Sequence, residues 1–240
     1  MAARVLLEVC VETPAGIEAA IEGGADRIEL CAALALGGLT PSAAMMTFAG
    51  KAGLPVTALI RPRAGGFRYD APELALIADD ISRARDAGLA GVAIGVGGAE
   101  GLDVAAMDRL MRAAEGLTVT LHRVFDLMED KARALEAART LGVARILTSG
   151  GAASAAQGAA TLAALVRQSA GRIGILAAGG IRAANARALV EATGVDEVHA
   201  SCGSAASATA AELAFGFAPA DQRVTDAAAV GALRSALDRA

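Results

Sequence analysis

Acidic, thiol and imidazole side chains recur at two-residue spacing in short apolar segments of this sequence. Glu8 stands two residues before Cys10 in LLEVCV, and Glu29 stands two residues before Cys31 in RIELC. His199 precedes a serine by the same interval in EVHAS. Residues two apart in a strand lie on the same face of a sheet, so each pair would present both members together. Carboxylates and imidazoles perform general acid–base catalysis, whereas thiolates bind soft metal ions.

Polar side chains also stand at the ends of other apolar segments. His122 and Arg123 follow the run LTVTL, and Arg61 and Arg63 follow VTALI. Guanidinium groups present planar sets of N–H donors that match the oxygens of carboxylates and phosphates. The hydroxyl residues at similar positions are Thr148, Ser149 and Ser201. Together these residue types predict a site that binds a small anion beside acid–base groups.

The elements that must position these groups are eight short β-rich segments, which alternate with alanine-rich segments of helical spacing. The β-rich segments begin at Arg4, Asp26, Pro55, Gly91, Leu117, Ala144, Arg172 and Glu197. Alternation of this kind predicts parallel strands joined by helices. Eight units most simply close into a (β/α)8 barrel, and the alternative is an open doubly wound sheet. No G-x-G-x-x-G motif follows the first segment, which favours the barrel.

We therefore predict an α/β protein with an eight-stranded parallel TIM barrel. It forms a single domain over residues 1–240 and is closed by a helix over residues 227–239. In such a barrel the C-terminal ends of the strands surround a common mouth, where the active site lies. The structural alternative is that arginine–glutamate pairs at this end only fill and neutralise the barrel interior.

The composition argues against several classes of function. The chain has 240 residues and a net charge of −4, and it lacks the basic surface that nucleic-acid binding needs. Aromatic residues make up only 2%, so platforms for stacking bases are scarce. No apolar run predicts a membrane span, and the N-terminal segment lacks the pattern of a signal peptide. Three cysteines do not make a disulfide scaffold and predict a reducing, cytoplasmic location.

Several motifs, in order along the chain, resemble the CutC family, which is associated with copper homeostasis. The matching segments are RIELCAALALGGLTPS (27–42), LIRPRAGGFRYD (59–70), LTVTLHRVFD (117–126), VARILTSGGAASAAQG (143–158), AAGGIRAANARAL (177–189) and DEVHASCG (196–203). The resemblance implies a cytoplasmic (β/α)8 barrel that forms homo-oligomers. The sequence departs from the family at Leu36 and Gly66, where the family usually carries acids. A ligand held by those acids would be bound differently here.

The resemblance makes copper(I) the first candidate ligand. Cu(I) prefers thiolate, and Cys10 and Cys31 are predicted at the ends of the first two strands. Adjacent strands lie about 4.8 Å apart, so two thiols there can approach one ion. The alternative is that both cysteines only pack as small apolar residues. Cys202 has the opposite parity to His199 and is expected to face the helices.

The second candidate is an enzyme of the isomerase or lyase type that acts on a small anionic metabolite, such as a phosphorylated one. Glu8, Glu29, His122 and His199 would then act as acids and bases or hold a divalent metal ion. No lysine stands at a strand end, which argues against a Schiff-base mechanism.

An anionic substrate would need donors around the mouth. Gly179 and Gly180 precede a predicted helix and resemble a backbone cradle for phosphate, with a tight turn as the alternative. The side chains expected to add charge or hydrogen bonds are Arg61, Arg63, Arg123, Ser149 and Ser201.

The role of His122 depends on how far its strand continues. If HRVFD stays extended, Asp126 shares the parity of His122 and is its expected partner, whereas Arg123 points to the other face. A hydrogen-bonded core histidine is the structural alternative.

Overall fold

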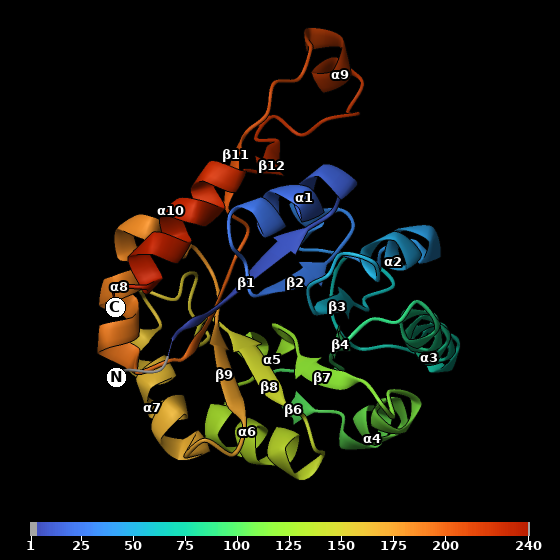
Figure 1. The fold of residues 1–240 in the computed structure, drawn as a ribbon. Helices are drawn as coiled ribbons and strands as arrows, with labels where there is room; N and C mark the ends of the chain where they lie inside the picture. The colour runs from blue at the N-terminus through green and yellow to red at the C-terminus, as the bar shows by residue number, and fades with distance from the viewer. Residues whose placement is uncertain (1–3, 240) are drawn as a thin grey trace.

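The computed structural model describes residues 4–239, and it contains a closed barrel of eight parallel strands. Around the barrel the order is β1-β10-β9-β8-β7-β4-β3-β2, so the strands follow one another in chain order until β10 pairs with β1 (Figure 1). The strands are β1 (Leu6–Val11), β2 (Arg27–Leu30), β3 (Val56–Leu59), β4 (Gly91–Ile94), β7 (Thr118–Leu121), β8 (Arg145–Thr148), β9 (Gly174–Ala177) and β10 (Glu197–Ala200). The predicted (β/α)8 barrel is confirmed.

Helices surround the barrel, and polar side chains fix where several of them begin. The helices that follow the barrel strands are α1 (Pro14–Glu22), α2 (Ala43–Ala49), α3 (Ala71–Asp86), α4 (Val104–Ala113), α6 (Lys131–Thr140), α7 (Ala159–Ser169), α8 (Ala183–Thr193) and α10 (Ala227–Leu237). The Thr13 hydroxyl accepts a hydrogen bond from the backbone N–H of Gly16 at the start of α1. Asp70 and Glu73 form a reciprocal capping box at the start of α3.

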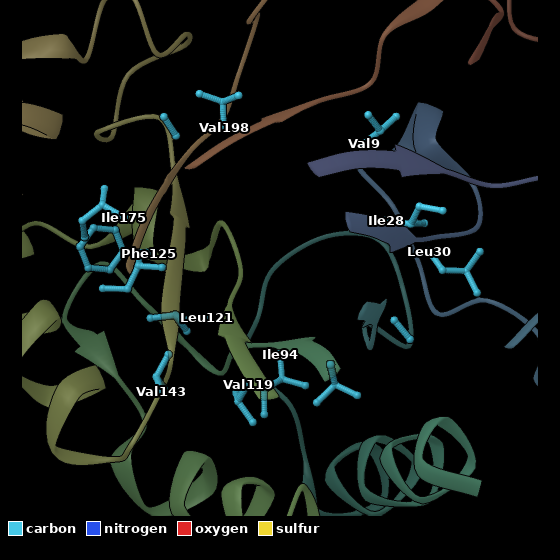
Figure 2. Packing of buried hydrophobic residues seen from close by; sticks show 14 of the residues in the cluster. Val9, Ile28, Leu30, Ile94, Val119, Leu121, Phe125, Val143, Ile175 and Val198 are labelled. Carbon is cyan, nitrogen blue, oxygen red and sulfur yellow. The ribbon is translucent and has the colours of Figure 1, made fainter. Parts of the chain in front are cut away.

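The apolar core lies mainly between the strands and the helices. Alternation along each strand sends Val9, Ile28 and Leu30 into this layer (Figure 2). Ile77 and Ile81 of α3 are buried in the same cluster. Burying each such side chain stabilises the fold by about 1.5–3 kcal/mol. The apolar layer between the strands and the helices therefore contributes most of the stability.

The inward faces of the strands are different, because they carry polar residues as well as small apolar ones. Arg27 donates to Glu8 at 2.5 Å and to Glu197 at 2.6 Å, and Arg145 lies 3.2 Å from Glu197. All four side chains lie inside the barrel, where each charge has an opposite charge beside it. These ion pairs, which we call the charged ladder, neutralise the barrel interior below the mouth.

Several short elements interrupt the repeating pattern. They are η1 (Leu34–Leu36), the hairpin of β5 (Gly97–Gly98) and β6 (Gly101–Leu102), α5 (Val124–Leu127), and an arm formed by β11 (Gly203–Ala205), α9 (Ala210–Ala214) and β12 (Arg223–Thr225). The sequence did not predict the arm, which projects away from the barrel between β10 and α10 (Figure 1). Among residues 4–239, no helix has the length and apolar character that crossing a membrane requires.

Candidate functional site

A cavity of about 720 Å³ opens at the C-terminal ends of the barrel strands. Both histidines and all three cysteines of the sequence line it. The structure therefore brings His122, His199, Cys10, Cys31 and Cys202 to one mouth, as the barrel topology predicts for the first four.

Glu8 and His199 meet because strand register places them opposite each other on β1 and β10. A Glu8 carboxylate oxygen lies 2.8 Å from Nδ1 of His199, and the other accepts from Arg27. Burial opposes ionisation of Glu8, but the hydrogen bond and charge of His199 and the charge of Arg27 outweigh it. They lower the pKa of Glu8 to about 2, so this carboxylate is a fixed anion.

His199 is held between this anion and a second carboxylate. Its Nε2 lies 3.8 Å from Glu29. Burial disfavours the imidazolium, but the neighbouring Cys10, Glu29 and Glu8 outweigh burial and raise the pKa of His199 well above 6.5. His199 is therefore charged, with Nδ1–H donating to Glu8 and Nε2–H directed to the side of Glu29.

Glu29 is buried and only partly satisfied. Its Oε2 accepts from the Cys31 thiol at 3.5 Å, whereas its Oε1 has no partner. Burial and the charge of Glu8 raise the pKa of Glu29. Burial and the neighbouring Glu29 also raise the pKa of Cys31, so the thiol keeps its proton. The result is a carboxylate that accepts protons more readily than an exposed one.

The same three side chains meet the distance requirement of a metal centre. Ligand atoms of Glu8, Glu29 and His199 lie within 4.8 Å of one another, and this is the only such trio among residues 4–239. Both Glu8 oxygens are already engaged, one with His199 and one with Arg27. The trio therefore fits a proton relay better than the divalent-metal site predicted as an alternative.

Arg61 lines the cavity as a buried cation, as expected for an anion-binding residue. Its guanidinium donates to the backbone carbonyls of Leu36, Gly38 and Gly65 at 2.9–3.0 Å. Gly38 has a φ of +85°, and a side chain there would also meet Leu59, so glycine is required for this loop path. No carboxylate within residues 4–239 forms an ion pair with Arg61, and its Nε–H has no partner.

The two positions where the sequence departs from the family lie in loops that contact Arg61 and Arg63. The carbonyl of Leu36 accepts a hydrogen bond from Arg61, and the carbonyl of Gly66 accepts one from Arg63. The acids that the resemblance implies at these positions are replaced by residues without charge. Neither position therefore supplies a carboxylate to pair with Arg61.

His122 lines the cavity, but its predicted partnership with Asp126 is wrong. Strand β7 ends at Leu121, and the chain turns into α5, so parity no longer applies. The backbone N–H of Val124 donates to Nδ1 of His122 at 3.2 Å, and its Nε2 has no partner. Burial lowers the pKa of His122 to about 3, so this imidazole is neutral.

Asp126 instead organises the loop after β8. It accepts hydrogen bonds from the Thr148 hydroxyl and from the backbone N–H groups of Ser149 and Gly151. Arg123 donates to both Asp126 and Ser149, and it lines the cavity rather than pointing to the other face. The Ser149 hydroxyl is buried and donates to a carbonyl within its own loop. Ser149 therefore supports the loop and does not line the cavity.

Arg63 also differs from its predicted role. It is exposed and forms an ion pair with Glu73, and it donates to carbonyls of its own loop. It does not line the cavity. The chain turns after Leu59, and this turn separates Arg63 from Arg61.

The glycine loop after β9 lies at the mouth, as predicted. Gly179 and Gly180 line the cavity with φ of +99° and +72°, which is the backbone of a tight turn into α8. Ser201 is exposed and lines the cavity as well. Sequence reasoning missed Arg182, which follows this loop and lines the cavity, although its place at the start of a helix after a glycine pair is a usable signal.

Cys202 was predicted to face the helices, and it does pack against the apolar core between the strands and the helices. It follows the end of β10 with a φ of +45° and lines the cavity, partly exposed. Burial and the neighbouring Cys10 and Asp226 raise the pKa of Cys202 to about 12, so the thiol is protonated. All three thiols therefore surround the same space.

Comparison with known proteins gives consistent matches. The model of the CutC family matches residues 5–204. A CutC family protein from Sinorhizobium medicae is 49% identical over 237 residues, which cover 98% of this chain and 97% of the relative. One from Caulobacter vibrioides is 50% identical over 238 residues, with the same coverage. The crystal structure of a CutC protein from Streptococcus agalactiae, whose name refers to copper homeostasis, has a TM-score of 0.78. The two sequences are 30% identical, and the match covers 82% of this chain and 98% of the Streptococcus chain.

Proposed function

This chain belongs to the CutC family, and on that premise we propose that it is an enzyme that performs acid–base chemistry on a small anionic metabolite. The observation that carries this proposal is the pairing of two features in one cavity. The Glu8–His199–Glu29 relay supplies groups that exchange protons, and Arg61 supplies a buried cation without a counter-ion.

Each member of the relay has a separate role. Glu8 stays ionised and orients His199, whose Nε2–H is the general acid. The unpartnered Oε1 of Glu29 is the general base. Carboxyl groups with raised pKa are effective bases near neutral pH, and a histidine held charged is an effective acid. The arrangement suits removal of a proton beside a carbonyl group and its return to another atom, as in an isomerase or a lyase.

Hydrogen exchange provides the most direct test. The protein would be incubated in deuterated water with a panel of sugar phosphates and dicarboxylates, and loss of carbon-bound protons would be followed by NMR. We expect exchange in at least one compound, loss of that exchange in Glu29→Gln, and normal exchange in the surface control Glu191→Gln. Thermal stabilisation by the same panel reports binding alone. If no compound either stabilises the protein or exchanges, the proposal is wrong.

Copper(I) binding is the second candidate, because Cys10 and Cys31 pack in one cluster and Cys202 lines the same cavity. The name of the Streptococcus relative points the same way. The donor set is soft enough for Cu(I), although the metal would have to displace the Cys31 proton, which Glu29 is placed to accept. Competition with a Cu(I) chelator tests this: the double variant Cys10→Ser/Cys31→Ser should lose tight binding and Cys202→Ser should keep it. Unchanged affinity of the double variant would reject the pair.

Two further properties remain proposals. The cytoplasm is the proposed location, because the three cysteines are unpaired. A homo-oligomer is the proposed assembly, as the family resemblance implies, and sedimentation analysis would test it.

A further inference from the structure

Two buried hydrogen-bond donors at the cavity wall lack acceptors. The Nε–H of Arg61 and the Nε2 of His122 have no partner, although the residues are only 7% and 3% exposed. Both residues line the cavity, and both contact Phe67: the guanidinium carbon of Arg61 lies 5.0 Å from the centre of its ring, and the centre of the His122 ring lies 4.8 Å from it. A buried donor without an acceptor is destabilising, so a ligand that supplies acceptors here binds favourably.

The fold fixes which nitrogen of His122 carries the proton. The backbone N–H of Val124 donates to Nδ1, so Nδ1 must be the unprotonated nitrogen. In a neutral imidazole the proton then lies on Nε2, which is buried in the wall of the cavity without a partner. His122 is therefore a hydrogen-bond donor and not a base.

The position of the ring is fixed as well. A methyl group on Gly95 would lie 2.7 Å from Cε1 and 2.8 Å from Nδ1 of His122, so only glycine leaves room for the ring there. Phe67 packs against the ring at an interplanar angle of 49°. Gly95 and Phe67 are positioning residues for the donor.

The charge of this part of the wall selects one class of ligand group. Arg61 contributes one positive charge that no carboxylate within residues 4–239 neutralises, and His122 contributes a neutral donor. We propose that Arg61 and His122 form a carboxylate-binding site, in which the Nε–H of Arg61 and the Nε2–H of His122 donate to the two carboxylate oxygens. A phosphate group carries nearly two negative charges at neutral pH and would leave one of them unmatched here.

This inference rests on the proposed function, and it adds an orientation for the substrate. His122 follows β7, which is four strands from β1 in both directions around the barrel. The carboxylate is therefore held on the side of the mouth opposite Glu8, and the part of the substrate that exchanges protons lies toward Glu29 and His199. The predicted substrate is a small carboxylic acid whose reacting group is not the carboxylate itself.

NMR of histidine side chains tests the site directly, because the chain has only two histidines. Protein with nitrogen-15 in its histidine rings would be titrated with glycolate, with its neutral amide glycolamide, and with inorganic phosphate. We expect His122 to show a protonated Nε2 and an unprotonated Nδ1 throughout. Glycolate should shift the Nε2 signal, and glycolamide should do so much more weakly.

Variants distinguish the contribution of the His122 donor from that of Gly95, which positions it. Substitution His122→Phe replaces the imidazole by an aromatic ring without an N–H donor. We expect roughly tenfold weaker glycolate binding. Gly95→Ala should displace the ring, so that glycolate binds more weakly and the residual binding no longer shifts Nε2. The exposed Arg63→Met is the matched control and should bind like the parent. If a variant fails to fold, the titration of the unmodified protein still tests the proposed site.

The outcomes distinguish this inference from the proposed function. If glycolate or phosphate shifts the ring signals of His199 but leaves those of His122 unchanged, the cavity binds anions and the proposed carboxylate-binding site is wrong. The site is also wrong if His122 carries its proton on Nδ1, or if phosphate displaces glycolate and shifts Nε2 more strongly. If neither histidine responds to any probe, both this inference and anion binding in the cavity are wrong.

Discussion

The two histidines of this protein line one cavity and have opposite protonation states. His199 lies between two carboxylates and is charged, whereas His122 lies against Phe67 and a backbone N–H and is neutral. His122 is buried and His199 is largely buried, so burial alone does not decide the charge. What decides it is whether an anion lies within reach of the ring.

The same contrast separates the two sides of the mouth. On the side of β1, β2 and β10, acids and bases contact each other and can pass protons. On the side of β3 and β7, the cation Arg61 and the neutral His122 each keep one buried ring or guanidinium nitrogen without a partner. In the proposed function one side exchanges protons and the other binds the ligand, and substitutions on each side test this division.

The largest effect is expected from Glu8→Gln. This change removes the anion that holds both Arg27 and His199, and breaking a buried ion pair costs about 3 kcal/mol. The pKa of His199 should also fall, so His199 would come to resemble His122. Urea unfolding measures the first effect, and NMR titration of the two histidines measures the second. An unchanged free energy of unfolding would show that the relay has no structural role.

A smaller effect is expected on the binding side from Arg61→Met. Glycolate binding should weaken by about 2 kcal/mol, because a hydrogen bond to a charged group is lost together with the cation that stacks on Phe67. Isothermal titration calorimetry would measure this change. Equal affinity in parent and variant would place the anion elsewhere in the cavity, with the glycine loop near Gly179 as the next candidate.

The pH dependence of stability should differ in sign between the two histidines. The pKa of His199 is raised in the folded state, so its contribution is full below pH 6.5 and is lost as the pH rises through the folded pKa. The pKa of His122 is lowered to about 3, so its contribution is lost as the pH falls below 6.5. Glu8, with a pKa of about 2, adds a further loss only below about pH 4.5.

Two variants make this pH contrast measurable by urea unfolding at a series of pH values. His122→Gln should flatten the loss of stability between pH 6.5 and 4.5, where Glu8 does not yet contribute. His199→Gln should flatten the loss above pH 6.5. The assignment fails if the two substitutions change the same limb of the curve.

The smallest effect is expected from Arg63→Met. Arg63 is exposed and pairs with Glu73 outside the cavity, and exposed ion pairs contribute little. Neither glycolate affinity nor the histidine signals should change. A clear loss of binding would restore Arg63 to the anion-binding role that the sequence suggested.

The sequence was a good guide where the chain is extended. The alternation of β-rich and helical segments predicted all eight barrel strands, and parity within them placed Glu8, Cys10, Glu29 and His199 inside. The family resemblance was confirmed over nearly the whole chain.

The sequence was a less certain guide beyond the ends of the strands, where Cys31, Arg61 and His122 line the cavity as predicted but other residues do not. Arg63, Asp126 and Ser149 follow the ends of β3, β7 and β8, and turns there remove the two-residue periodicity on which the predictions relied. Loop contacts such as the carbonyls around Arg61 depend on backbone conformation, which glycine permits but does not specify. The projecting arm was missed because it lies between two regular units.

The charged ladder of Arg27, Glu197 and Arg145 has a consequence for the movement of molecules through the protein. It fills the barrel axis beneath Glu8, so the cavity has a floor. A ligand of the cavity therefore cannot pass through the barrel from one end to the other. It must enter and leave at the C-terminal ends of the strands, so anything that covers the ends of β1, β3 and β10 would slow both steps.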